Sequence, residues 1–531
     1  MDYNISMNSI ETSAIKYRVQ ASAFISIMAL CLIPAKATDL SIASSNKRIA
    51  TTFNILHQQN RETSSDQLIT KLEQLQTDVI KNSIAISLEE AIALGVKNNP
   101  DLEIAFTEIQ MREWELIHAK RKWYPTLKVY GGAPFTGYTW STFVENNYSK
   151  GAATRTTKDR SKIYNINPRA TISWDFLDLT RQPEINAAED SLRRQKLLFN
   201  VSARNLILRI QQSYFSIQSS AQLIDSFKGI YAINKQQLRI LSERQGIGMT
   251  TVLDVEQVKS QLFAQLNQLV GYTQDYITQT GELAKNLALE PGQLAIPTEK
   301  AKPQGVWTQS LSQTIDEALE QREEILANIA AAEAAEWNGV AALRQYLPIF
   351  SLKASGDLSS TNGYQDILVN EDPNKNIRDG QRWNAAIGIG FQWKIFDGGL
   401  NAASAETRFS RSRKFVASAS KTKLQVTQEV QSSYGAMETS QVGIKSAEQA
   451  YRSAEIAQEA ARARFDVGVG DIFSVVQAIN LLSNAATQKS ASTLKYNLSI
   501  AQLYRYSANW PINSKNDAYL RIKTNRTIKQ P

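Results

Sequence analysis

Apolar residues follow a helical period over most of this chain. After residue 178 the period continues to about residue 244, and a second helical stretch runs from about 251 to 289. The segment 245–251 between them contains glycines, which tolerate the positive φ at which many helices end. The pattern therefore predicts two long helices joined by a tight turn, which is a helical hairpin.

The same pattern returns about 220 residues later. Helical stretches run from about 400 to 465 and from 472 to 507, with a second glycine turn at 465–471. Adding 220 to Gly248 gives Gly468, so the turns have the same spacing relative to their helices. The chain is therefore predicted to contain two structural repeats, each built around a long helical hairpin.

Each repeat also contains two segments in which apolar and polar residues alternate, as they do in strands. These strands are predicted at about 126–144, 163–177, 349–360 and 383–396. They are long enough to cross an outer membrane, which takes roughly ten residues. Four strands cannot close a barrel by themselves, and open edges are not tolerated in lipid. Strands in a membrane would therefore need further copies of the chain, whereas the alternative is an ordinary sheet packed on the helices.

The N-terminus has the three-part plan of a secretory signal peptide. Lys16 and Arg18 precede the apolar run 21–33, and an A-x-A cleavage site ends at residue 37. No run of eighteen apolar residues follows, so no transmembrane helix is expected. The only cysteine, Cys31, lies within this segment, and the bulky leucine before it disfavours lipidation.

Composition excludes several classes of protein. Hydrophobic residues make up 43% and charged residues 21%, unlike a disordered chain. The net charge of +8 is spread along the sequence rather than gathered in one patch, which disfavours binding to nucleic acid. The two histidines, His57 and His118, have no cysteine near them, so neither a metal site nor another cofactor is expected. No residues assemble a nucleophile, a base and an oxyanion site, so we expect no enzyme.

These patterns divide the chain into successive parts. We predict a signal peptide at 1–37, a polar extension with one short helix at 38–85, the first repeat at 86–297, a linker at 298–309, the second repeat at 310–512 and a basic tail at 513–531. Trp174, Trp383 and Trp393 fall on the predicted strands, either as an aromatic girdle at the membrane surface or as strand packing.

Several motifs resemble the TolC-like family of outer-membrane efflux proteins, over about residues 86–513. They are the Leu-Glu-Glu-Ala-Ile opening at 88–92, Tyr124-Pro125, Leu347-Pro348, Ile395-Phe396-Asp397-Gly398-Gly399 and the two glycine turns. The resemblance implies an α+β membrane protein that forms a homotrimer. Its twelve strands would form one shared β-barrel, continued by an α-helical barrel with the glycine turns at its periplasmic tips.

The resemblance also implies where partners and a gate would lie. Docking to a periplasmic adaptor and an inner-membrane pump is expected at Gly246, Gly248, Thr250, Leu253, Gly468, Gly470, Ile472 and Phe473. In such proteins, rings of aspartates narrow the closed entrance, and here the candidate gate residues are Asp254, Ser474 and Gln477. Because two of these three are not acidic, we expect a weakened carboxylate ring.

The function that follows is a passive exit duct in the outer membrane of a Gram-negative-type cell. It would extend into the periplasm and serve a tripartite efflux or type I secretion system, passing small molecules or proteins. The lack of a lipidation cysteine resembles the secretion branch. The alternative is an exported soluble coiled-coil scaffold or periplasmic adaptor, whose strands would form an ordinary β-domain.

Overall fold

The computed structural model of the chain describes residues 65–131, 135–145, 155–369 and 372–510. The predicted signal peptide, His57 and the predicted basic tail lie outside these residues. From Ile69 onward the described residues belong to one compact unit. The two halves of the chain therefore share one fold instead of forming separate domains.

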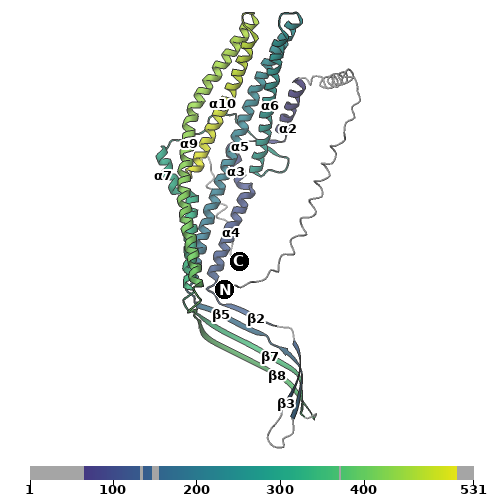
Figure 1. Ribbon diagram of the computed structural model, residues 1–531, viewed down its shortest axis with the longest axis vertical. Coiled ribbons are helices and arrows are strands. Elements are labelled where there is room, and N and C mark those ends of the chain that lie inside the picture. The colour runs from purple at the N-terminus through teal and green to yellow at the C-terminus, as the bar shows by residue number, and fades with distance from the viewer. Residues whose placement is uncertain (1–64, 132–134, 146–154, 370–371, 511–531) are drawn as a thin grey trace, which may run out of the picture. The chain divides into compact units, whose positions relative to one another are not determined.

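Helices and strands alternate in a similar order in both halves (Figure 1). The first half contains α2 (Ser65–Lys81), β1 (Ser83–Ile86), α3 (Leu88–Asn98), α4 (Pro100–Arg121), β2 (Thr126–Tyr130), β3 (Phe135–Glu145), β4 (Arg155–Ile166), β5 (Arg169–Leu177), α5 (Arg181–Gly246), α6 (Val252–Leu287) and β6 (Leu294–Pro297). The second half contains α7 (Leu311–Gln321), α8 (Glu323–Arg344), β7 (Ile349–Val369), β8 (Asp372–Gln392), α9 (Leu400–Asp466) and α10 (Ile472–Tyr506). The predicted long helices agree with these bounds to within a few residues.

Each half has one very long helix with two shorter partners. α5 has 66 residues and α9 has 67, which makes each roughly 100 Å long at 1.5 Å per residue. α4 and α6 contact α5, whereas α8 and α10 contact α9. Pro183 lies in the first turn of α5, where a missing N–H breaks no bond within the helix. No helix of the described residues has the length and apolar character needed to cross a membrane.

Two clusters of buried side chains hold these helices together. The larger one lies around Phe199, Tyr214 and Phe227 of α5 and includes residues of α3, α6 and β6. The second cluster lies near the glycine turns and contains Leu241 of α5 and Val475 of α10, together with residues of α6 and α9. Because the second cluster draws on both helical hairpins, the hairpins pack against each other.

The six longer strands form one antiparallel sheet. β7 and β8 pair along their full length, from Ile349 opposite Gln392 to Val369 opposite Asp372. The other edge of β7 pairs with β5 and then with β4, which pair in turn with β2 and β3. In Figure 1 the sheet lies beyond the ends of α4 and α9, and the glycine turns lie at the opposite ends of the long helices.

The strands extend beyond the predicted bounds. β4 begins at Arg155, eight residues before the predicted start, and β7 and β8 continue through the segment predicted as a loop. β8 ends at Gln392, four residues before the predicted end. Apolar and polar residues alternate along a strand only where one face of the strand is removed from water. Backbone pairing between strands needs no apolar side chain. The sequence pattern therefore located mainly the parts of these strands that have an apolar face.

Candidate functional site

The turn after α5 ends that helix with a left-handed glycine. The N–H of Gly248 donates to the carbonyl of Gln245 and the N–H of Met249 donates to that of Arg244, both at 2.9 Å. This pair of bonds is the Schellman motif, which satisfies the last carbonyls of a helix. Gly248 has a φ of +75°, a value that side chains disfavour. Gly246 is the last residue of α5 itself.

The turn after α9 has the same backbone geometry. The N–H of Gly468 donates to the carbonyl of Phe465 and the N–H of Val469 donates to that of Arg464, both at 3.0 Å. Gly468 has a φ of +78°. Gly470 is constrained differently, because a Cβ there would lie 3.1 Å from the backbone nitrogen of Phe465. A side chain at residue 470 would therefore press on the end of α9.

The helices that follow the two turns are capped by different residues. In α6, the hydroxyl of Thr251 accepts from the N–H of Asp254 at 3.2 Å, and the Asp254 carboxylate accepts from the N–H of Thr251 and the hydroxyl of Thr250, both at 2.9 Å. In α10, the carboxylate of Asp471 accepts from the N–H of Ser474 at 2.9 Å. Hydrogen bonds from Thr251 lower the pKa of Asp254, and those from Ser474 lower the pKa of Asp471. The acidic residue thus occupies the third helical position in one turn and the cap in the other.

The other predicted docking and gate residues differ in exposure. Leu253 is 65% exposed and Phe473 is 58% exposed. Ile472 is only 6% exposed and belongs to the cluster that packs α5, α6, α9 and α10 together. Ser474 and Gln477 are exposed on α10. The turns therefore present some predicted residues to a partner and use others to hold the helices.

Arg244 joins the two turns, which the sequence did not predict. Its guanidinium lies over the ring of Phe465, 4.9 Å from the centroid, and donates to the carbonyl of Asp466 at 3.4 Å. A cation at the C-terminal end of a helix is favoured by the helix dipole, and its position over an aromatic ring adds attraction. Arg244 is one of many basic residues on the long helices, so no spacing distinguished it.

At the other end of the long helices, the sheet separates apolar from polar residues. Residues directly opposite each other on paired strands share a face. The apolar face consists of Leu127, Val129, Ala170, Ile172, Trp174, Phe350, Leu352, Ala354, Gly356, Leu358, Trp383, Ala385, Ile387, Ile389 and Phe391. The polar face consists of Thr126, Lys128, Tyr130, Arg169, Thr171, Ser173, Ser351, Lys353, Ser355, Asp357, Ser359, Arg382, Asn384, Ala386, Gly388 and Gly390. No charged residue lies on the apolar face within these segments.

The apolar face has about the length of a membrane-spanning strand. From Phe350 to Leu358 it covers nine residues of β7. A tilted strand that crosses an outer membrane needs about 9–11 residues. Two rows beyond Leu358 and its partner Trp383, the same side holds Asn362 and Asp379. The strands thus continue past the apolar band with polar residues.

Tryptophans mark both limits of the apolar face. The indole N–H of Trp174 donates to the carbonyl of Trp123 at 2.8 Å, and that of Trp393 donates to the carbonyl of Tyr346 at 2.9 Å. Both bonds tie the end of a strand to the end of the preceding helix. Trp383, at the opposite limit, is 78% exposed. Rings with one apolar body and one polar end suit a boundary between lipid and water, which favours the girdle interpretation.

A buried cluster of charged residues, here called the charged joint, lies at the N-terminal end of α8. It consists of Arg204, Arg322, Glu323, Glu324, Glu429 and Arg505, which come from both halves of the chain. Arg204 pairs with Glu323 at 3.1 Å. Arg322 pairs with Glu324 at 3.0 Å and with Glu429 at 2.8 Å. Burial raises the pKa of Glu324, but Arg505 and Arg322 outweigh this effect and lower it to about 2.

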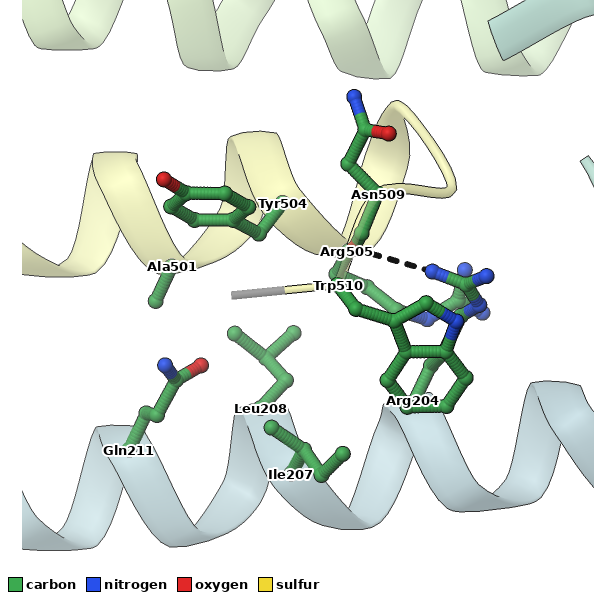
Figure 2. A pocket seen from close by; sticks show the side chains of 9 residues that line it. All are labelled: Arg204, Ile207, Leu208, Gln211, Ala501, Tyr504, Arg505, Asn509 and Trp510. Carbon is green, nitrogen blue, oxygen red and sulfur yellow. Dashed lines mark hydrogen bonds between the residues drawn. The ribbon is translucent and has the colours of Figure 1, made fainter. Parts of the chain in front are cut away.

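Figure 2 shows a small cavity beside the charged joint, between α5 and α10. Arg204 lies under the ring of Trp510, 4.1 Å from its centroid, and donates to the carbonyl of Asn509 at 3.0 Å. The cavity volume is about 10 Å³, which is the space of a single water molecule. The cavity therefore belongs to the packing at the end of α10. Nowhere in the described part of the chain do three His, Cys, Asp or Glu side chains gather as metal ligands.

Two matches to one family cover most of the chain. The family is described as "Outer membrane efflux protein", and its model matches residues 92–288 and 314–509. The chain belongs to the outer membrane efflux protein family. Each match falls on one half of the chain, so each half by itself has the family's sequence pattern.

Known relatives and solved structures agree with this assignment. Outer membrane protein TolC of Vibrio cholerae is 25% identical over 340 residues, covering 62% of this chain and 72% of that protein. TolC of Escherichia coli is 23% identical over 363 residues, covering 66% and 71%. Crystal structures of CusC and of VceC from Vibrio cholerae share the fold, with TM-scores of 0.63 and 0.60 at 17% and 18% identity. Both matches cover 80% of this chain, and they cover 93% and 96% of those structures.

Membership of this family confirms several predictions from the sequence. The protein is an efflux channel of the outer membrane, and it is not an enzyme. The fold is that of TolC-like channels, mostly helical, with a six-stranded sheet and the short parallel pair of β1 and β6 among the described residues. The family match favours the channel over the soluble scaffold or adaptor that the sequence left open.

Proposed function

We propose that three copies of this chain form a passive exit duct for a tripartite efflux or type I secretion system. Each copy would contribute four strand runs to a barrel of twelve strands. Two of the runs consist of two strands each, β2 with β3 and β4 with β5, and the other two are β7 and β8. The duct would receive small molecules or proteins from an inner-membrane pump through a periplasmic adaptor. The single observation that carries this proposal is the sheet, with its uncharged apolar face and its open edges.

The open edges are the reason why several copies are needed. Within the described residues, one edge of β8 and one edge of β2 and β3 have no strand partner. Unpaired N–H and C=O groups in hydrocarbon each cost several kcal/mol, so only closed barrels are stable there. A copy that joins its β8 to the first strand run of the next copy would satisfy both edges. Three copies would supply twelve strands, within the range of known outer-membrane barrels.

The helices would carry the passage away from the membrane. α5 and α9 lead from the sheet to the glycine turns over roughly 100 Å. Such helices would place the turns deep in the periplasm, and the three copies together would form the α-helical barrel. The contact between both helical hairpins near Leu241 and Val475 supports a continuous wall within each copy.

The glycine turns would be the docking site for the adaptor. Ile247 and Met249 of the first turn are 71% and 72% exposed, and Val467 and Val469 of the second are 74% and 72% exposed. Small apolar side chains on both turns offer a surface that an adaptor's own apolar residues would cover. We propose that Phe473, which is also exposed, lies within this docking surface.

The entrance would be narrowed by polar residues at the start of α6 and α10. Asp254, Ser474 and Gln477 are the proposed gate residues. The Asp254 carboxylate also closes the capping box of α6, so a gate role would add to its structural role. Asp471 supplies a second exposed carboxylate near the same level, and it belongs among the gate candidates.

Charge placed on either face of β8 tests the proposal. Ile387 lies in the middle row of the apolar face and Ala386 on the polar face of the same strand. Arginine at the middle of a lipid-facing surface costs about 2–4 kcal/mol, so Ile387→Arg should reduce the amount of trimer in the outer membrane. Ala386→Arg should leave trimer assembly nearly unchanged. Membrane fractionation measures the amount of protein in the outer membrane, and native mass measurement in detergent gives its oligomeric state. A water-soluble monomer, or equal effects of the two variants, would refute the duct.

A further inference from the structure

The polar face of the sheet carries a ladder of positive charge. Lys353, Lys128, Arg169 and Arg382 lie in four successive rows of that face, one cation in each row. Rows on one face are separated by about 7 Å, so the ladder covers roughly 20 Å. Asp357, in the same row as Arg169, is the only acidic residue in these rows. Each copy therefore has three net positive charges along this face.

These charges are not neutralised within the copy. All four cations are exposed, and none of them has an acidic partner within ion-pair distance among the residues that the structure describes. The carboxylate of Asp357 accepts from the side-chain amide of Asn384 at 3.0 Å. This hydrogen bond does not change the charge of Asp357, so the four rows keep their excess of three positive charges per copy.

We propose that the membrane-spanning part of the duct favours anionic solutes. This inference rests on the proposed function, in which the apolar face meets lipid and the polar face lines the passage. Three copies would then place four rings of lysine or arginine around the lumen. Rings of basic side chains are the feature by which pores select anions.

The expected preference can be worked from the size of such fields. Charges of one sign along a cleft with low-dielectric walls produce potentials of several kT. A potential of only one kT would enrich a monovalent anion over a monovalent cation about sevenfold. Screening reaches about 10 Å at 0.1 M salt and about 3 Å at 1 M. The preference should therefore be strong at low salt and weak at high salt.

The charges near the glycine turns are balanced in number. Residues 236–260 contain Arg239, Arg244 and Lys259 against Glu243, Asp254 and Glu256, and residues 460–475 contain Arg462 and Arg464 against Asp466 and Asp471. The two segments together hold five basic and five acidic residues, so their net charge is zero. The anion preference is therefore assigned to the four rows of the sheet, where cations are in excess.

Reversal potentials in planar lipid bilayers test the inference. The purified full chain would be measured in a tenfold KCl gradient at low salt. We expect chloride to be several-fold more permeant than potassium. The double variant Lys128→Glu with Lys353→Glu changes three net positive charges per copy into one net negative charge, so the preference should turn toward potassium. Lys300→Glu makes the same kind of change on the exposed linker after β6, and should leave the chloride preference in place.

The outcomes separate this inference from the proposed function. A wild-type channel that prefers potassium, or a preference that the double variant does not alter, would overturn the anion selectivity while leaving the duct intact. A chloride preference that persists unchanged at 1 M KCl would also contradict it, because screening should have removed the field. If the purified protein is a water-soluble monomer that does not insert into the bilayer, the duct itself is refuted, and the selectivity with it.

Discussion

Removing the charge of Glu324 should weaken the charged joint. Its carboxylate accepts from Arg322, which precedes α8, at 3.0 Å and from Arg505 at the end of α10. The side chain of Glu324 is 23% exposed, and those of Arg322 and Arg505 are 5% and 6% exposed. Glu324→Gln keeps the size of the side chain but leaves two buried arginines with less compensation, which is costly in a poorly solvated site.

The magnitude follows from the pKa of this group. Its folded value is about 2, against an ordinary value of 4.5, and this difference corresponds to roughly 3 kcal/mol of stability at neutral pH. Because the folded pKa is the lower one, the stabilisation is fully present above about pH 5 and is lost as the pH falls from 4.5 toward 2. The substitution should therefore cost most at pH 7, less than half as much at pH 3, and little only near pH 2.

Thermal unfolding of the detergent-solubilised protein measures this effect as a function of pH. With an unfolding entropy of about 2.1 cal/mol/K per residue and more than four hundred described residues, 3 kcal/mol lowers the Tm by about 3 °C. The control is Glu320→Gln on α7, where the carboxylate is exposed, and its Tm should match wild type. A Glu324→Gln variant whose Tm falls with acid as steeply as that of wild type would refute the assigned role of the charged joint.

Three further substitutions test the turns and the strand ends. Gly468→Leu should cost about 1–2 kcal/mol because of its positive φ, and it should impair export without changing the β signal in circular dichroism. The control is Gly435→Ala, in the interior of α9 with open space around it, which should leave export unchanged. Wild-type export by the leucine variant would contradict the docking role. Trp393→Phe keeps the ring but loses the bond to Tyr346, so the Tm should fall by an amount equivalent to about 1 kcal/mol. Asp254→Ala should destabilise the start of α6 by about 1 kcal/mol. If the carboxylate narrows the entrance, the variant should also raise the conductance of the channel. An unchanged conductance would contradict the gate role and leave only the capping role.

The sequence predicted the features that depend on local chemistry. Glycine spacing located both turns, and the helical period gave the long helices almost to their ends. The apolar alternation found the part of each strand that has an apolar face, but it missed residues 155–162, 361–369 and 372–382, where polar residues predominate and no regular apolar face is present. The spacing of apolar residues cannot distinguish such a strand from a polar loop, because the strand is defined by its backbone pairing with a partner that is distant in the sequence.

The charged joint could not have been predicted from one sequence. Arg204 and Glu323 are 119 residues apart, and Arg505 lies 181 residues from Glu324. Each is an ordinary charged residue in an amphipathic helix, and only the packing of four helices makes its environment buried. Long-range ion pairs of this kind leave no spacing in the sequence, in contrast to caps and turns, whose partners lie within five residues.

Residues at equivalent positions in the two glycine turns do not have equivalent structural roles. At an offset of 220, Asp254 aligns with Ser474 and Thr251 aligns with Asp471. At the position equivalent to Asp254, the second turn therefore has a hydroxyl residue instead of a carboxylate. By role, however, a carboxylate accepts a backbone N–H at the helix start in both turns, from Thr251 in the first and from Ser474 in the second, and the acid has moved from the third helical position to the cap. A ring of carboxylates at the entrance would therefore draw on Asp254 and Asp471 together, and its charge should be judged from both residues.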